Sequence, residues 1–207
     1  MQNLIDLELV KKELKRKLPL KRYIHSLNVS NTAVKLCRVY NVCKDKGEIA
    51  GLLHDYAKYL SNDEMCKYIK EFKIEIDEVI NSQKDLAHGL IGAELVKRKF
   101  KIQDLDILNS IRYHTTGRKE MTNLEKIIYL SDYIEPNRKF PGIEEIRKMA
   151  LKDLNKATLM ALDNTIKYII IKGLLLHSNS LLARNNLILE MNASGNICPD
   201  IREDIRW

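Results

Sequence analysis

The stretch GLLHDYAKYL, residues 51–60, places a histidine and an aspartate side by side inside an apolar run. His54 and Asp55 follow two leucines and precede Ala57, so they interrupt what would otherwise be a buried helix face. Burying a carboxylate without a partner costs free energy. The pair therefore requires something in the core that satisfies both side chains.

The rest of the chain has the composition and periodicity of helices. It has 207 residues, 8 Gly and 4 Pro, and it is rich in residues that favour helix. The only strand-like pattern, FKIEI at 72–76, is short. We expect an all-α, single-domain bundle of about eight to ten helices over residues 1–190, with a tail over 191–207. The helices are expected at 4–18, 20–40, 46–60, 62–72, 86–99, 104–115, 122–135, 142–149, 153–177 and 179–190.

Four more polar residues lie on the apolar stripes of these helices, at spacings that share a helix face. They are His25, His88, His114 and Asp132. Taken singly, a histidine on such a face is usually a core residue satisfied by its neighbours, and Asp132 could be an ordinary packing or capping carboxylate. With His54 and Asp55, however, they make four imidazoles and two carboxylates. A small core does not readily provide so many separate partners.

A divalent metal ion would satisfy all six groups. It accepts neutral imidazole nitrogens and carboxylate oxygens, and it supplies the positive charge that a buried aspartate needs. Adjacent helix residues point about 100° apart, so His54 and Asp55 can both reach one ion, and Asp55 can bridge to a second. Six nitrogen and oxygen ligands without a thiolate predict a two-metal site. Iron, manganese, cobalt or magnesium fit it better than a structural zinc.

The ordered set of histidines and aspartates resembles that of the HD-domain metal-dependent phosphohydrolases. Five segments are more specifically similar to the YqeK-type HD proteins, symmetrical bis(5′-nucleosyl)-tetraphosphatases that cleave diadenosine tetraphosphate into two ADP. These segments are RYIHSLNV at 22–29, AGLLHDYAK at 50–58, AHGLIGAELV at 87–96, IRYHTTGR at 111–118 and YLSDYIEPNRKFPG at 129–142. The resemblance covers roughly residues 4–190.

The resemblance implies an iron-containing site and a division of the ligands between its parts. It implies that one metal is held by His25, His54, Asp55 and Asp132. His88 and His114 would then serve a second metal or the substrate phosphates. The resemblance also leaves a substrate role open for His177 and Arg184, which otherwise read as structural.

The expected reaction is attack of a metal-bound hydroxide on a central phosphorus, with ADP as the leaving group. A metal-bound water has a pKa near 7 in favourable sites, against about 15.7 in bulk. Asp55 and Lys58 are the candidate catalytic residues. Lys58 is expected one turn after His54 on the same helix face, where a solvated lysine is the competing interpretation. Two other enzyme activities remain open, those of a nucleotidase and a cyclic-nucleotide phosphodiesterase.

The candidate nucleotide contacts surround the predicted ligands. They are Arg22, His88, His114, Thr115, Thr116, Tyr133 and Arg138. Arg138 follows Asp132 in a loop that contains Pro136, where a guanidinium could grip a phosphate with two hydrogen bonds. For Arg22 a plain surface role competes. The two threonines could instead mark a helix end, with Gly117 in the left-handed conformation, and Tyr133 could simply pack.

The net charge and the cysteine content limit which partners and which cell compartment we expect for the chain. The net charge is +7, and the basic segment KKELKRKLPLKR at 11–22 carries +6 of it. Such a surface favours anions, although a solvated helix face is the simpler explanation. A nucleic-acid-binding or regulatory module is the alternative of another class, but no such motif appears, so we expect a nucleotide partner and no nucleic acid.

The four cysteines are scattered, which favours free thiols in the cytoplasm. No leader pattern is seen at the N-terminus, and the longest apolar clusters are too short to span a bilayer. The sequence does not fix the oligomeric state, and a homodimer of this chain is left open.

Overall fold

The computed structural model describes residues 6–193, and in that part of the chain all regular structure is helical. It contains eleven α-helices and one short 3-10 helix, so the prediction of an all-α fold is confirmed. The elements are α1 (Leu7–Lys17), α2 (Leu20–Val39), α3 (Lys44–Leu53), α4 (Asn62–Glu71), α5 (Glu78–Ser82), η1 (Lys84–Leu86), α6 (Ala87–Lys99), α7 (Leu105–Arg112), α8 (Asn123–Ile134), α9 (Ile143–Ala150), α10 (Leu154–Ile171) and α11 (Ser178–Ala193).

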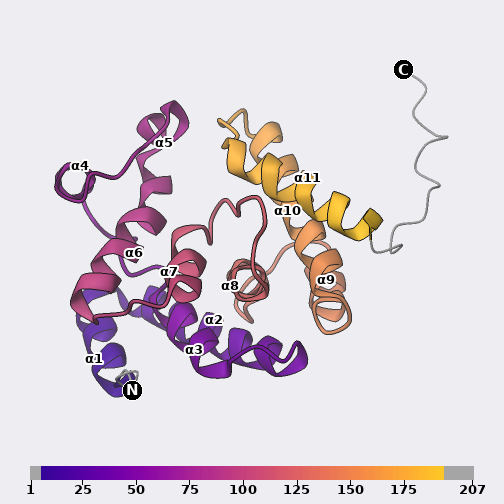
Figure 1. Ribbon diagram of the computed structural model, residues 1–207, viewed down its shortest axis with the longest axis horizontal. Helices are drawn as coiled ribbons and strands as arrows, with labels where there is room; N and C mark the ends of the chain where they lie inside the picture. The colour runs from indigo at the N-terminus through magenta and orange to yellow at the C-terminus, as the bar shows by residue number, and fades with distance from the viewer. Residues whose placement is uncertain (1–5, 194–207) are drawn as a thin grey trace.

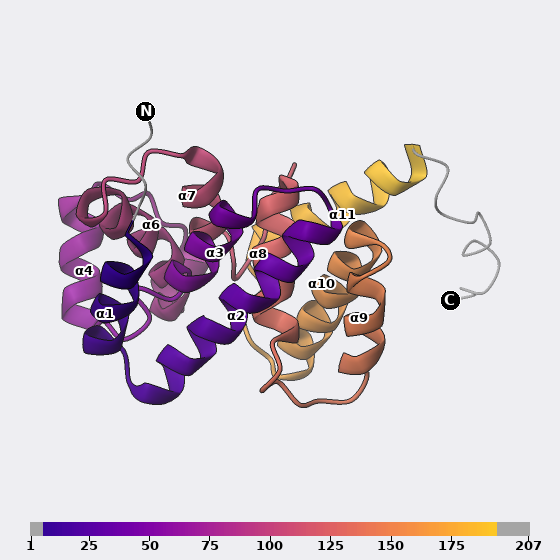
Figure 2. The same cartoon turned by 90° about the horizontal axis from the view of Figure 1, so that it is seen from below.

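The helices form a bundle whose middle is built from α2, α3, α7 and α8 (Figures 1 and 2). Helix α2 packs along α3 and α8, and α7 packs against α3, α6 and α8. Helices α4 and α6 contact each other at one end of the molecule, while α9, α10 and α11 lie at the other end, with α10 against α8. The middle group therefore brings together helices that are far apart in the sequence.

Most helices begin at a residue whose side chain accepts a hydrogen bond from a free N–H of the first turn. Asp6, Asp104, Thr122 and Asp153 act in this way for α1, α7, α8 and α10. Ser61 forms the complete capping box that its sequence predicts for α4. The capping chemistry explains why the starts of α4, α7, α8 and α10 were predicted to within one residue. The start of α1 was predicted at residue 4 and lies at Leu7.

The predicted helix over 46–60 is wrong in its second half, because α3 ends at Leu53. The ring nitrogen Nδ1 of His54 lies 2.7 Å from the carbonyl oxygen of Gly51, the acceptor that the next helical N–H would use. A side chain that takes a backbone acceptor competes with the helix. The chain continues in tight turns, in which Tyr56 N–H donates to the Leu53 carbonyl and Lys58 N–H to that of Asp55.

The same competition shortens the helix predicted over 104–115. His114 Nδ1 lies 2.7 Å from the carbonyl oxygen of Ile111, and α7 ends at Arg112. The helix predicted over 153–177 ends at Ile171 for another reason, since Gly173 adopts φ +63°. Helix α5 was not predicted, which is why the count exceeds ten. The expected tail over 191–207 lies outside the described residues from 194 onward.

Two glycines, one in α3 and one in α6, allow neighbouring helices to approach closely. A Cβ on Gly51 of α3 would lie 2.6 Å from the Cα of Ser30 in α2. A Cβ on Gly89 of α6 would lie 2.7 Å from the carbonyl oxygen of Arg112 at the end of α7. No other residue fits these contacts without a backbone shift, and each contact lies beside a predicted ligand.

Candidate metal centre

The structure brings all six predicted ligands to one place in the middle of the bundle. His25 comes from α2, His88 from α6 and Asp132 from α8, while the other three follow the ends of α3 and α7. The four histidines and Asp55 are each at most 8% exposed, and Asp132 is partly exposed. These are the polar residues that broke the apolar stripes in the sequence.

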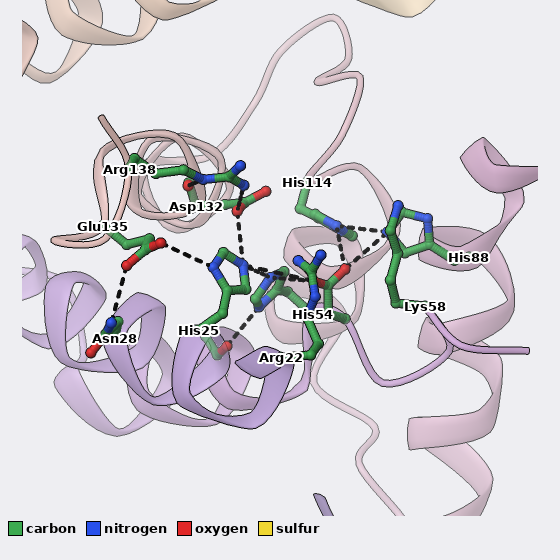
Figure 3. A network of polar contacts seen from close by, with 12 residues as sticks. Arg22, His25, Asn28, His54, Lys58, His88, His114, Asp132, Glu135 and Arg138 are labelled. Atoms are coloured by element: carbon green, nitrogen blue, oxygen red, sulfur yellow. Dashed lines mark hydrogen bonds and ion pairs between the residues drawn. The ribbon is translucent and has the colours of Figure 1, made fainter. Parts of the chain in front are cut away.

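The Asp55 carboxylate lies between two pairs of histidines, His25 with His54 and His88 with His114. Figure 3 shows these pairs on either side of Arg22. Its Oδ1 is 3.1 Å from Nε2 of His88 and 3.6 Å from Nε2 of His114. Its Oδ2 is 3.3 Å from Nε2 of His54 and 3.7 Å from Nε2 of His25. Each oxygen of one carboxylate thus faces its own pair of imidazoles.

The ring nitrogens within each pair also face each other. The two Nε2 atoms are 3.2 Å apart in the pair of His25 and His54, and 3.1 Å apart in the pair of His88 and His114. Asp132 Oδ1 lies 3.0 Å from Nε2 of His25. Three sets of side chains each bring one donor atom within 4.8 Å of the others: His25, His54 and Asp55; His54, His114 and Asp132; and Asp55, His88 and His114.

The outer nitrogens of three histidines fix their tautomers. Nδ1 of His54, His88 and His114 each meets a main-chain carbonyl three residues earlier, that of Gly51, Asp85 and Ile111 respectively. A carbonyl only accepts, so each Nδ1 carries the hydrogen and each Nε2 presents a lone pair to the centre. Converging lone pairs and carboxylates repel unless a cation lies between them. This donor set therefore fits a divalent metal ion.

His25 is held differently, by a residue that sequence reasoning missed. Its Nδ1 lies 3.3 Å from Oε1 of Glu135, which is 3% exposed. Asn28 donates its amide to the other carboxylate oxygen of Glu135 at 3.1 Å (Figure 3). The backbone N–H of Asn137 donates to the same oxygen at 2.8 Å. Glu135 lies three residues after Asp132, and this spacing is the signal that could have found it. Such carboxylates orient metal-binding histidines.

The charges of the centre stabilise one another. Burial disfavours the ionised form of Asp55, but the positive charge of a protonated His54 and the hydrogen bonds that protonated imidazoles donate hold the pKa of Asp55 well below its usual range. For Asp132, burial is likewise outweighed, first by the close contact of Oδ1 with Nε2 of His25, and its pKa is lowered. Burial opposes protonation of His54, yet the carboxylate of Asp55 raises its pKa. Both carboxylates are therefore anionic and ready to bind a cation.

Three predicted basic residues lie around the centre, each bound to an acid. Arg22 Nη1 is 2.7 Å from Asp55 Oδ2, and Arg138 Nη2 is 2.8 Å from Asp132 Oδ1. Lys58 is not on the helix face that was predicted for it, because the helix ends before it. Its Nζ is 2.6 Å from Oδ2 of Asp85, the residue whose carbonyl orients His88.

A pocket of about 230 Å³ opens beside Asp132 and His114. We call it the aromatic pocket, because its walls include rings. It is lined by His114, Thr115, Tyr129, Asp132, Tyr133, Arg138, Phe140 and Thr165. The ring of Tyr133 meets that of Phe140 edge to face, with centroids 5.1 Å apart. Four predicted nucleotide contacts therefore line one cavity at the edge of the centre.

The other candidates lie elsewhere or turn inward. Thr116 is buried and donates its hydroxyl to the carbonyl of Gly117, which has φ +66°. This is the geometry expected from the alternative interpretation of a helix end. His177 accepts the N–H of Asn179 at the start of α11 and lies 3.1 Å from Asp77. Arg184 pairs with Asp163 at 2.6 Å, so it too is outside the centre.

A helical bundle with four histidines and two aspartates at its middle defines a class of proteins. The chain belongs to the HD domain family, which it matches over residues 22–137. This range contains all six converging side chains and Glu135. Among solved structures, the chain is similar to a crystal structure described as a predicted HD superfamily hydrolase involved in NAD metabolism from Clostridium acetobutylicum. The TM-score is 0.86 at 46% identity, over 89% of this chain and 98% of that one.

Three relatives that share one enzyme name are similar to the chain over most of their length. The chain is 42% identical to the symmetrical bis(5′-nucleosyl)-tetraphosphatase of Bacillus subtilis (strain 168), over 84% of this chain and 93% of that protein. It is 42% identical to the protein of the same name from Halalkalibacterium halodurans, over 82% and 90% of the two chains. For that of Staphylococcus aureus the identity is 36%, over 86% and 92%.

Between residues 6 and 193, no helix combines the length and the apolar character that crossing a bilayer requires.

Proposed function

We propose that this chain hydrolyses diadenosine tetraphosphate and related dinucleoside tetraphosphates symmetrically, giving two ADP from diadenosine tetraphosphate. The proposal is carried by the convergence of four imidazole nitrogens and two carboxylates beside an aromatic pocket. Three relatives that are 36–42% identical over most of their length are named for this activity.

The proposed cofactor is iron, as one or two ions, with manganese or cobalt as substitutes. Its proposed ligands are His25, His54, Asp55, His88, His114 and Asp132. An imidazole and carboxylate set without thiolate suits these ions. A bound divalent cation supplies positive charge to phosphate oxygens and lowers the pKa of a water molecule towards neutrality.

The residues of the chain position the ligands and place positive charge around the substrate. The carboxylate of Asp55 contacts one histidine pair with each of its oxygens and so fixes the position of the two pairs relative to each other. Lys58, held by Asp85 beside His88, provides an ammonium for a phosphate of the leaving ADP. Arg22 supplies a guanidinium beside Oδ2 of Asp55, the carboxylate oxygen that also faces His54. Charge stabilisation of this kind is often the largest contribution to catalysis.

The aromatic pocket is the proposed place for one nucleoside. Tyr133 offers a ring face or edge to the base, and Thr115 offers a hydroxyl to the ribose or phosphate. Arg138 engages Asp132 through Nε and Nη2, which leaves Nη1 for a phosphate oxygen. His88 and His114 serve the second ion or the phosphates. Thr116 is left out of these contacts, because its hydroxyl is buried and bonded to the main chain.

The reaction breaks one bond and makes one. The oxygen of a water molecule bonds to one of the two central phosphorus atoms. The bridging oxygen between these two atoms leaves with the other ADP, and the protons of the water are released to solvent at neutral pH. Because ADP is a good leaving group, the chain needs charge stabilisation more than a proton donor.

We also infer a reducing cytoplasmic location. The described cysteines Cys37, Cys43 and Cys66 are all unpaired. Free thiols are the usual state of cysteine in that compartment.

Chromatography of the products tests the proposal directly. The purified chain is stripped of metal, reloaded with iron, manganese or cobalt, and incubated with diadenosine tetraphosphate. We expect two ADP and no ATP. Production of ATP with AMP, or release of phosphate from nucleoside monophosphates alone, would show that the substrate assignment is wrong. Asp55→Asn, purified in the same way, controls for contaminating hydrolases.

A further inference from the structure

A second cavity lies between α1 and α6, and none of the six metal-centre residues lines it. It has a volume of about 280 Å³. We call it the α1 cavity. Its polar and aromatic walls are Glu13, Arg16, Lys17, Tyr56, Tyr68 and Lys99. Three of these come from the basic segment 11–22, which the metal centre uses only through Arg22.

The one acidic group of the α1 cavity is already saturated with cations. Glu13 Oε1 lies 3.0 Å from Nη2 of Arg16 and 2.5 Å from Nζ of Lys99. Tyr56 donates its hydroxyl to the same oxygen at 3.3 Å. These hydrogen bonds, that of Arg16 first, lower the pKa of Glu13 to about 2. Glu13 is therefore anionic at neutral pH, and its single charge is shared by two cations.

The third cation of the α1 cavity has no acidic partner. Lys17 is half-buried, and its Nζ lies 4.3 Å from the centroid of the Tyr56 ring. Among the described residues, no carboxylate lies within ion-pair distance of it. Burial, together with repulsion from Lys99, lowers the pKa of Lys17. The walls thus carry three positive groups against one negative, and an unpaired ammonium is held in place by an aromatic ring.

We propose that the α1 cavity binds a small anion with two or more linked phosphates, such as inorganic pyrophosphate or the polyphosphate end of a nucleotide. Its volume falls just below the roughly 300–1,000 Å³ of sites that enclose drug-sized ligands, so it suits a phosphate group rather than a whole dinucleotide. Arg16 already holds both carboxylate oxygens of Glu13 through Nε and Nη2, which leaves Nη1 for a phosphate oxygen. The two ammonium groups add charge. The site is separate from the proposed active site.

Isothermal titration of the full-length, metal-loaded protein with inorganic pyrophosphate tests this site. Lys17→Met removes the unpaired charge and keeps an apolar side chain over Tyr56. Lys15→Met is the matched control, because Lys15 is exposed on the same helix and does not line the cavity. At fixed ionic strength we expect Lys17→Met to weaken one class of sites at least about tenfold, the loss of one charge-assisted contact. Lys15→Met should change affinity less than about twofold.

Two results would overturn the proposal. Equal weakening by both substitutions would mean that pyrophosphate senses only the diffuse charge of the basic segment. No weakening by Lys17→Met would mean that pyrophosphate binds only at the metal centre. Lys99→Met, at a more exposed position, gives an independent reading if Lys17→Met fails to fold. None of these outcomes depends on hydrolysis of diadenosine tetraphosphate.

Discussion

The two sides of the Asp55 carboxylate hold their histidines by different means. On the His88 side, which consists of His88 and His114, both outer nitrogens meet main-chain carbonyls. On the Asp132 side, which consists of His25, His54 and Asp132, the outer nitrogen of His25 meets the Glu135 carboxylate instead. A carboxylate partner makes an imidazole a stronger ligand than a neutral carbonyl does.

Side-chain chemistry can therefore set the metal affinity mainly on the Asp132 side. The Asp132 side has two carboxylates, Arg138 and a chain of hydrogen bonds through Asn28. The His88 side has only the backbone and the Lys58–Asp85 ion pair. We therefore expect the Asp132 side to bind a cation more tightly. The substitutions below test this difference, in order of decreasing effect.

Asp55→Asn should disable both sides together. The amide keeps the shape of the side chain but loses its charge and one acceptor, and both histidine pairs depend on it. We expect activity to fall by more than about 100-fold, beyond the 10–100-fold typical of residues that only orient a ligand. Metal analysis of the purified variant should show loss from both sides. Full metal content with full activity would contradict the role of Asp55.

Glu135→Gln should weaken only the Asp132 side. The neutral amide can still accept the His25 hydrogen bond but no longer strengthens the ring as a ligand. We expect metal affinity to fall about 10–100-fold, measured by competition with a chelator. Glu125→Gln is the matched control, because Glu125 is as buried as Glu135 but pairs with Arg118 away from the centre. If both variants lose metal equally, the charge of the Glu135 carboxylate does not strengthen metal binding through His25.

Arg138→Lys should affect substrate binding more than metal binding. Lysine keeps the charge near Asp132, but it lacks the planar guanidinium that can bond Asp132 through Nε and Nη2 and still present Nη1 to a phosphate oxygen. Loss of one charge-assisted hydrogen bond predicts a rise of about tenfold in KM, with metal content unchanged. Arg112→Lys, which changes an arginine paired with Glu94, should leave KM unchanged. A loss of metal in Arg138→Lys would instead assign this residue to holding Asp132.

Lys58→Met should have the smallest effect, on the His88 side. The lysine is partly exposed and already paired with Asp85, so we expect kcat to fall less than about tenfold. Asp85→Asn distinguishes two explanations. If Lys58 contacts substrate, Lys58→Met should lower kcat more than Asp85→Asn does. Equal losses in the two variants would show that the ion pair only holds the backbone that orients His88.

Much of this arrangement could be predicted from the sequence, because it depends on local periodicity. Polar residues on apolar stripes predicted which six side chains converge, and capping residues such as Ser61 predicted where helices begin. Glu135 was missed because its partner His25 lies 110 residues away. The end of α3 was missed because it depends on which way the His54 ring turns, and periodicity carries no information on that.

The acceptors of three histidines are main-chain atoms, and this limits how the protein can change over evolutionary time. A substitution alters a side chain but leaves the carbonyls of Gly51, Asp85 and Ile111 where they are. Random drift therefore cannot easily retune those three imidazoles. Glu135 is the exception, so descendants or engineered variants with altered metal preference should differ first at that residue and at Asn28.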